Sequence, residues 1–233
     1  MTIPPANPSR PAGGTASGAG SDRVTGGAAA DLGSMTIGDF CQSLAAKTPV
    51  PGGGAVAGVT AAHAASLLAM VVAYSRGKAS FAAFEADTDA ILAVLHRQAI
   101  DALDGARADA EAYAALNALW KRPATDPERV ARWSTAVTHA IAAPQRIVRL
   151  AAHLSERCRL LAGQTAKHLD SDLAIAVDLA GCAARAAAWN VRVNLPSLAD
   201  SSERVAIQRD LDELLTIVQE DVHAVLRILE SRS

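Results

Sequence analysis

The chain has 233 residues, enough for one domain of good size. Its formal net charge of −2 and pI near 6.3 exclude the strongly basic field typical of nucleic-acid-binding proteins. Half of the residues are hydrophobic but only 3% are aromatic, so we expect a core of Ala, Leu, Val and Ile. Alanine is the strongest helix former, and the β-branched, aromatic-rich stretches that strands favour are scarce. The composition therefore predicts an all-α domain.

The N-terminal segment indicates where the folded domain begins, and the cysteines indicate the cellular compartment. Residues 1–34 are mostly Pro, Gly, Ala and Ser, and they cannot bury enough apolar surface to offset the entropy of ordering. We expect a disordered tail without the apolar region of a signal peptide, followed by a single domain over 35–233. Cys41, Cys158 and Cys182 are far apart, which is typical of free thiols in a reducing cytoplasm.

The domain is predicted to be a bundle of about six to eight helices. A short first helix begins at a capping box formed by Thr36 and Asp39, and it is ended by Pro49 and Pro51. Residues 55–75 are apolar nearly all round and long enough to span a membrane, which needs about 20 such residues. Because this stretch is rich in alanine and contains a histidine, a buried Ala- and Gly-rich central helix is favoured over a membrane span.

A long third helix is expected over about 84–120. After a break, Thr125 or Asp126 caps the next helix, with Pro127 near its first position. Pro144 is expected to kink or restart that helix, which continues to about residue 167.

The last two helices are likewise predicted from their caps and their apolar residues. A buried helix begins at a cap formed by Asp170 or Ser171 and ends at Asn194. Within it, Asn190 and Asn194 are polar groups on an otherwise apolar helix, and Asn194 is most simply a terminator. A final amphipathic helix is predicted over about 201–229.

The most conspicuous motif is the glycine-rich stretch "TPVPGGGAVAGV", which contains Gly52, Gly53 and Gly54. A Walker A loop would require Lys and Ser or Thr after the glycines, but Ala55 follows here. A dinucleotide site would require a preceding strand and an acid about 20 residues later, and the next acid is Glu85. Two interpretations stay open: a tight turn into a closely packed helix, or a helix N-terminus whose bare N–H groups face a ligand.

A second candidate is Asp109, within "RADAEAY". Helix neighbours lie three and four residues apart, so Arg107 pairs with Glu111 but no basic side chain of the same helix reaches Asp109. On a stripe of small and apolar residues, desolvation would raise the pKa of Asp109 towards the range useful for acid–base catalysis. Spacing alone favours a solvated aspartate at the edge of the bundle. The histidines show no metal-ligand spacing with nearby carboxylates, so no metal site is expected.

Taken together, several blocks resemble the cyclodeaminase/cyclohydrolase family, which includes the cyclodeaminase half of formimidoyltransferase-cyclodeaminase and the bacterial methenyltetrahydrofolate cyclohydrolases. The blocks are "FCQSLAAKTPVPGGGAVAGVTAAHAASLLAMV", "YSRGK", "ADAEAY", "AAP" and "SDLAIAVDLAGCAARAAAWNVRVNL". The resemblance covers nearly the whole expected domain. It implies an all-α protein, dimeric or higher, that acts on a reduced folate carrying a one-carbon unit, with no nucleotide or metal cofactor. We expect a homodimer without a nucleic-acid or membrane partner.

Carried over residue by residue, the resemblance places the catalytic aspartate at Asp109. It implies that further residues bind the substrate: the glycine turn near the folate, two lysines near its glutamate tail, and two positioning groups. These are Gly52, Gly53, Gly54, Lys78, Lys121, Ser171 and Asn194.

Two departures from the family pattern bear on the activity. The Gly-Asn pair that usually precedes Ser-Asp-Leu is missing before Ser171, and the lysines after the central helix are reduced to "RGKAS". Such changes would loosen folate binding, shift the substrate, or mark a relative without activity. The leading hypothesis is a formimidoyltetrahydrofolate cyclodeaminase. The alternatives are a methenyltetrahydrofolate cyclohydrolase and a non-catalytic ligand-binding or oligomerisation protein on the same scaffold.

Overall fold

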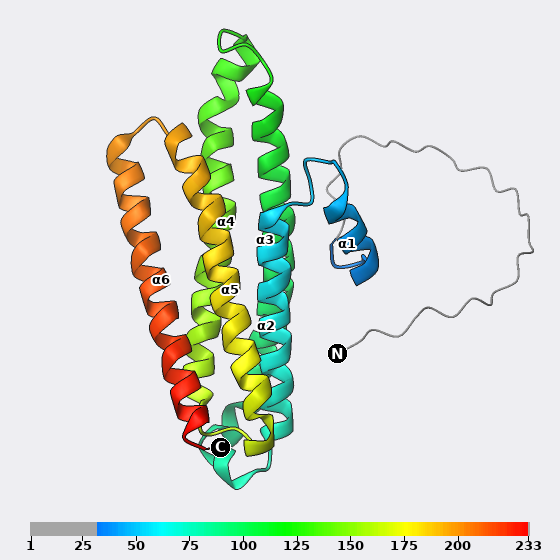
Figure 1. The fold of residues 1–233 in the computed structure, drawn as a ribbon, viewed down its shortest axis with the longest axis vertical. Helices are drawn as coiled ribbons and strands as arrows, with labels where there is room; N and C mark the ends of the chain where they lie inside the picture. The colour runs from blue at the N-terminus through cyan, green and yellow to red at the C-terminus, as the bar shows by residue number, and fades with distance from the viewer. Residues whose placement is uncertain (1–31, 233) are drawn as a thin grey trace, which may run out of the picture.

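The computed structural model describes residues 32–232, and the regular structure in that range is helical throughout (Figure 1). The prediction of an all-α bundle is confirmed, whereas the expected tail lies outside the described residues except at its C-terminal end. In chain order the elements are α1 (Ile37–Ala45), α2 (Gly53–Ser75), the 3-10 segment η1 (Ala79–Asp87), α3 (Thr88–Trp120), α4 (Pro127–Leu161), the short η2 (Lys167–Leu169), α5 (Asp170–Asn194), η3 (Leu195–Ser197) and α6 (Ser201–Glu230).

Four long helices form the core. Helices α2, α3, α4 and α5 run side by side, with α2 against α3 and α5, and α4 against the same two helices (Figure 1). Helix α6 covers the outer side of α4 and α5. The buried side chains are mostly Ala, Val and Leu, as the composition predicted. Cys158 belongs to this core, and the three cysteines are free thiols.

The central helix α2 packs very closely on α3. A Cβ atom placed on Gly58 would lie 2.6 Å from the Cβ of Ala106 and 2.7 Å from the carbonyl oxygen of Ala102. A side chain there would force the two helices apart, which explains the Ala- and Gly-rich sequence of α2. By length and composition α2 is apolar enough to cross a membrane, and 61% of its most apolar window is buried against the rest of the bundle.

Two of the expected helix caps are present. The Oγ1 of Thr36 accepts a hydrogen bond from the backbone N–H of Asp39 at 3.1 Å. The carboxylate of Asp126 accepts from the N–H groups of Glu128 and Arg129, both at 3.0 Å. Both caps are short-range features, so the sequence alone could predict them.

Three expected boundaries are wrong. Helix α4 ends at Leu161 rather than near 167, because Gly163 adopts the left-handed conformation with φ +81°. Neither Asp170 nor Ser171 caps α5, because the preceding 3-10 turn makes Leu169 the N-cap residue without a side-chain bond. The expected third helix begins at Thr88, and the residues before it form the 3-10 segment η1.

Helix α4 passes through Pro144 without restarting. A proline has no N–H group, so the carbonyl of Ala140 lacks its usual helical donor. That carbonyl accepts a hydrogen bond from Nδ2 of Asn194 at 3.0 Å instead. The same Nδ2 donates to the carbonyl of Asn190 at 2.9 Å, so the buried Asn194 ties the end of α5 to α4.

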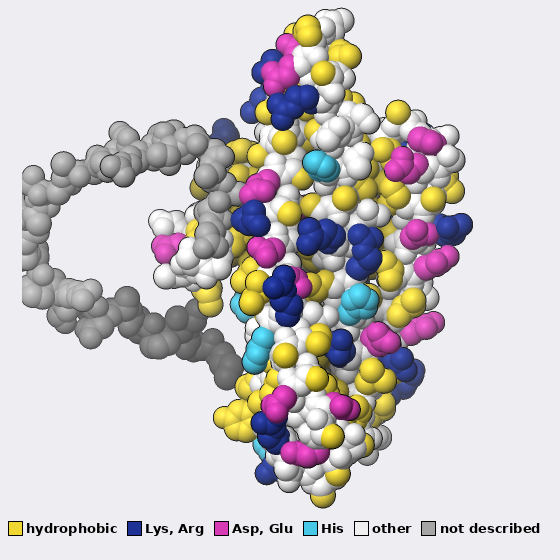
Figure 2. All heavy atoms as spheres, turned by 180° about the vertical axis from the view of Figure 1, so that it is seen from behind, with side chains coloured by type: hydrophobic (Ala, Val, Ile, Leu, Met, Phe, Trp, Pro, Cys, Tyr) yellow, Lys and Arg dark blue, Asp and Glu magenta, His cyan; other side chains and the backbone are white. Residues whose placement is uncertain are grey.

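The surface of the molecule has a region of mixed charges and an exposed apolar face on α1. On the side opposite to the view of Figure 1, acidic and basic side chains are interspersed (Figure 2). Many of them are paired along one helix, as Arg97 is with Asp101. Helix α1 stands apart from the bundle (Figure 1), and the side chains of Ile37 and Leu44 are 74% and 37% exposed. Residues 32–232 of a single chain therefore leave the apolar face of α1 uncovered.

Candidate active site at the start of α2

The carboxyl group of Asp109 occupies the space that a side chain on Gly54 would fill. A Cβ atom on Gly54 would lie 1.7 Å from Oδ2 of Asp109 and 2.8 Å from Oδ1. Gly54 is in the first turn of α2, and Asp109 lies in the C-terminal half of α3. The contact places an acid directly against the start of the central helix, and only glycine allows it.

Asp109 is a partly buried acid, not the solvated aspartate that spacing alone favoured, and as expected it has no partner on its own helix. Within residues 32–232 its carboxyl has no hydrogen bond and no ion pair, whereas Arg107 bonds to Glu111 at 2.9 Å as expected. The side chain is partly buried, and desolvation raises its pKa to about 6. A carboxyl group with this pKa can both accept and release a proton near neutral pH.

The N-terminus of α2 beside this acid has no side-chain cap, because the N-cap residue is Gly52. The first bond within the helix runs from the N–H of Val56 to the carbonyl of Gly52 at 3.1 Å. The geometry of an α-helix leaves the N–H groups of the preceding positions, including Gly53 and Gly54, without acceptors inside the helix. The turn therefore combines the two features that the sequence left as alternatives: close packing at Gly54 and bare donors at the helix start.

Asn190 approaches the same turn from α5. A Cβ atom on Gly53 would lie 3.8 Å from its Oδ1 and 3.9 Å from its Nδ2. Its Nδ2 donates to the carbonyl of Ala186 at 3.4 Å, a long bond, and no donor to its Oδ1 occurs within residues 32–232. The sequence showed Asn190 only as a polar group on an apolar helix. Its spacing of four from Asn194 placed both side chains on one face, and this was the available signal.

The other expected site residues lie farther along the helices. Lys78 follows the C-terminal end of α2, and Ser171 is in the first turn of α5 at that same end of the bundle (Figure 1). With a helical rise of 1.5 Å per residue, these ends lie roughly 30 Å from Gly54. Lys121 caps the end of α3, about 18 Å beyond Asp109 by the same measure. One chain thus unites the glycine turn with Asp109 but not with Lys78 or Ser171.

The departure from the family pattern also lies at that remote end. The stretch that lacks Gly-Asn forms η2 and the start of α5, before Ser171. Ser171 and Asn190 are 19 positions apart on α5, which corresponds to about 28 Å. Within one chain the surroundings of Asp109 are therefore unaffected by this departure.

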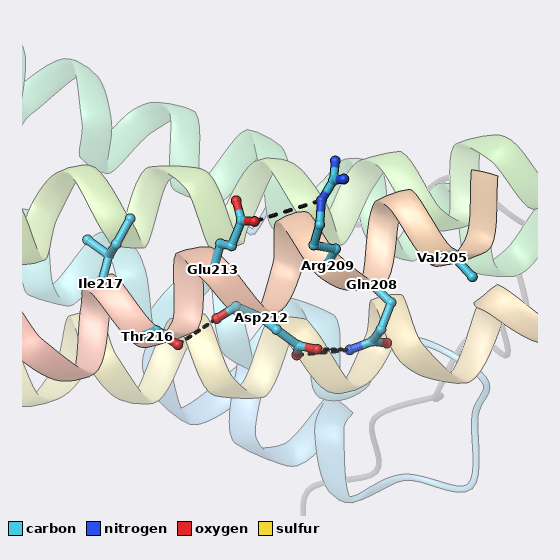
Figure 3. A pocket seen from close by; sticks show the side chains of 7 residues that line it. All are labelled: Val205, Gln208, Arg209, Asp212, Glu213, Thr216 and Ile217. Carbon is cyan, nitrogen blue, oxygen red and sulfur yellow. Dashed lines mark hydrogen bonds and ion pairs between the residues drawn. The ribbon is translucent and has the colours of Figure 1, made fainter. Parts of the chain in front are cut away.

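Two further hollows have linings without Asp109. A groove of about 350 Å³ lies between α3 and α4, with His139 and Arg146 on one side and Glu111 on the other. A hollow of about 780 Å³ is lined, within residues 32–232, by side chains of α6 (Figure 3). In the part of the chain that the structure describes, no group of three His, Cys, Asp or Glu side chains is arranged to hold a metal ion.

Comparison with known proteins places this fold and this turn in a family. The family model for formiminotransferase-cyclodeaminase matches residues 36–213, which include α2, α3, α4 and α5. The chain belongs to this family. The match ends inside α6, and it contains Gly54, Asp109 and Asn190 together.

Similar members of the family have two activities. The chain is 29% identical over 195 residues to a methenyltetrahydrofolate cyclohydrolase of Methylorubrum extorquens, covering 78% of this chain and 90% of that protein. It is 26% identical over 200 residues to the formimidoyltransferase-cyclodeaminase of Gallus gallus, covering 84% of this chain but only 37% of the relative. A crystal structure of a formiminotetrahydrofolate cyclodeaminase from Thermotoga maritima superposes with a TM-score of 0.79 at 26% identity, covering 86% of this chain and 98% of that one.

Proposed function

We propose that the chain is a formimidoyltetrahydrofolate cyclodeaminase, which closes the 5,10-methenyl ring of the folate and releases ammonia. The observation that carries the proposal is the unpaired, partly buried carboxyl of Asp109 against the uncapped start of α2. The solved cyclodeaminase that the chain matches over 98% of that protein's length supports this choice within the family.

In this reaction N10 of the folate attacks the carbon of the formimino group on N5, which reacts in its protonated, cationic form. A C–N10 bond forms, and the proton on N10 must leave while the amino group of the adduct must gain one. The ionised carboxyl of Asp109 accepts the proton from N10 and delivers it to the amino group, so that ammonia departs as the C–N bond breaks. Such a transfer contributes about 10²–10⁴-fold to the rate.

The environment of Asp109 suits this cycle. Its pKa of about 6 leaves the group mostly ionised at neutral pH, yet close enough to protonate and release in turn. The methenyl product carries a positive charge shared by N5 and N10, which the carboxylate offsets at short range. The free N–H groups of Gly53 and Gly54 supply donors for a carbonyl oxygen of the pteridine ring, and Asn190 supplies a carboxamide beside them.

A cyclohydrolase is the second candidate, and the Methylorubrum extorquens relative, matched over 90% of its length, favours it. In that reaction water attacks the methenyl carbon and gives a proton to Asp109. The carboxyl returns the proton to N5 as the C–N5 bond breaks, and the hydroxyl proton of the adduct leaves to solvent as the formyl C=O forms, which yields 10-formyltetrahydrofolate. The same residue therefore serves either reaction.

We further propose that the enzyme works as a homodimer in the cytoplasm, without a nucleotide or metal cofactor. The exposed apolar side chains of Ile37 and Leu44 on α1 support a partner copy, because residues 32–232 of one chain leave them exposed. The remote positions of Lys78 and Ser171 support it as well. In a dimer, these residues of one copy can serve the site of the other.

The test is to incubate the purified chain with each folate and follow the absorbance of the methenyl form. We expect the absorbance to rise with the 5-formimino substrate, whereas a fall with the methenyl folate would identify the cyclohydrolase. Asp109→Asn should lower turnover at least 100-fold, and the matched control Glu111→Gln, on the same helix but exposed and paired, should not. Wild-type turnover by Asp109→Asn would refute the assigned role. A reduced folate that stabilises the fold without turnover would indicate the non-catalytic scaffold.

A further inference from the structure

A second groove, between α5 and α6, combines apolar and polar groups. It has a volume of about 460 Å³, within the usual range for small-molecule sites. Leu215, Val218 and Val222 of α6 provide its apolar lining. The indole of Trp189 on α5 also lines it and is 69% exposed, so a large aromatic face is available to a ligand.

One arginine of this groove is already neutralised. Arg192 bonds to Asp212 at 2.8 Å, and its guanidinium carbon lies 5.7 Å from the ring centroid of Trp189. Asp212 also accepts from Gln208 at 2.9 Å (Figure 3). Two hydrogen bonds lower the pKa of Asp212, with the larger effect from Gln208 and a smaller one from Arg192. Asp212 therefore stays ionised and balances the charge of Arg192.

The other arginine of the groove has no counter-charge. No carboxylate pairs with Arg185 and no group bonds to it within residues 32–232. Its guanidinium lies against Gly181, which has no side chain to block it. A Cβ atom on Gly181 would lie 3.1 Å from Nη1 of Arg185 and 3.1 Å from Cγ2 of Val222. The groove thus holds one uncompensated guanidinium next to an open aromatic face.

We propose that this groove binds a planar aromatic monocarboxylate. The ring stacks on Trp189 and over the apolar side chains of α6, and aromatic faces favour such offset contacts. The carboxylate pairs with the fork of Arg185, whose geometry suits two parallel hydrogen bonds. A single free positive charge matches one negative charge, whereas a doubly charged phosphate would keep one charge unbalanced. Gln219 and His223 line the groove as further polar partners.

The site does not depend on the proposed folate reaction, because its lining shares no residue with the surroundings of Asp109. The experiment is calorimetric titration of the full chain with 2-naphthoate. Decahydronaphthalene-2-carboxylate, which has the same charge and carbon skeleton without the aromatic face, and 2-naphthyl phosphate serve as comparison ligands. We expect saturable binding of one naphthoate per chain, and at least fivefold weaker binding of both comparison ligands.

Arg185→Gln and Trp189→Leu should each weaken naphthoate binding at least tenfold. Arg209→Gln is the matched control, because Arg209 is an exposed arginine of α6 that pairs with Glu213 and does not line this groove (Figure 3). The variants change exposed side chains, and circular dichroism verifies that they fold. Wild-type affinity in Arg185→Gln, equal binding of the saturated carboxylate, or no saturable binding by the wild type would each overturn the proposal.

Discussion

The carboxyl of Asp109 fills the place of the missing side chain of Gly54, 1.7 Å from where its Cβ would be. This contact joins α3 to the start of α2, and it explains why a glycine is required at one position of the turn. The neighbouring Gly53 has more space, because its Cβ would only touch Asn190 at 3.8 Å. The two adjacent glycines therefore give a matched pair for testing the site.

Gly54→Ala is expected to displace the carboxyl of Asp109 by an ångström or more and to reduce kcat about 100-fold, since misplacement of this size costs that much in oriented reactions. Gly53→Ala should keep kcat within about threefold, since an ordinary van der Waals contact requires no movement. Steady-state kinetics of the two variants, with circular dichroism as a check on folding, measures the difference. Equal rates for both variants would mean that the position of Asp109 does not matter.

The raised pKa of Asp109 predicts a pH-dependent stability. The folded state binds the proton more tightly than the unfolded state, because the pKa rises from 3.8 to about 6 on folding. This contribution is fully present below pH 3.8 and is lost as the pH rises through 6. At about 1.4 kcal/mol per pKa unit, Asp109 should lower the free energy of unfolding by about 2 kcal/mol between pH 4.5 and 7.5.

Asp109→Asn should remove this decrease, as urea unfolding at the two pH values would show. The same proton governs activity: kcat/KM should fall tenfold per pH unit below pH 6, where the base is protonated. If the difference in free energy of unfolding between the wild type and Asp109→Asn stays the same across this pH range, the pKa of Asp109 is not raised on folding.

Asn194 and Pro144 are predicted to be coupled through the carbonyl of Ala140. Asn194→Ala should leave that buried carbonyl without a donor and cost about 1–3 kcal/mol of stability. In the Pro144→Ala background the new N–H of residue 144 satisfies the carbonyl, so the same substitution should cost about 1 kcal/mol less. A double-mutant cycle measured by denaturant unfolding gives the coupling. Asn117→Ala should cost the same in both backgrounds, and additive effects at 144 and 194 would refute the link.

Gly58→Ala should destabilise the bundle, because the new Cβ would meet Ala106 at 2.6 Å and the backbone of Ala102 at 2.7 Å. Overpacking of this kind costs about 1–3 kcal/mol, more than the roughly 1 kcal/mol that alanine gains in helix propensity. Gly38→Ala in α1 is the control, since its Cβ would only approach Oγ1 of Thr36 at 3.8 Å. Thermal unfolding should show a lower Tm for the first variant alone.

Much of the fold follows from short-range physics. The cap at Asp126 and the pairing of Arg107 with Glu111 involve residues two to four apart, so the sequence was sufficient to predict them. The same spacing predicted that Asp109 has no basic partner on its own helix. The end of α4 at Leu161 was missed, because nothing local distinguishes a glycine that turns the chain, as Gly163 does, from one that continues a helix.

The sequence by itself determined the helical class, most of the helix positions and the lack of a basic partner for Asp109 on its own helix, because these depend on propensity and on neighbours along one helix. Only the tertiary structure decided that Gly54 receives the carboxyl of Asp109, that Asn190 faces the same turn, and that Asn194 serves the carbonyl freed by Pro144. These contacts join residues about 50 or more positions apart, and they depend on how the helices align. No spacing rule within one helix can give that alignment, since packing of the small side chains of α2 sets it.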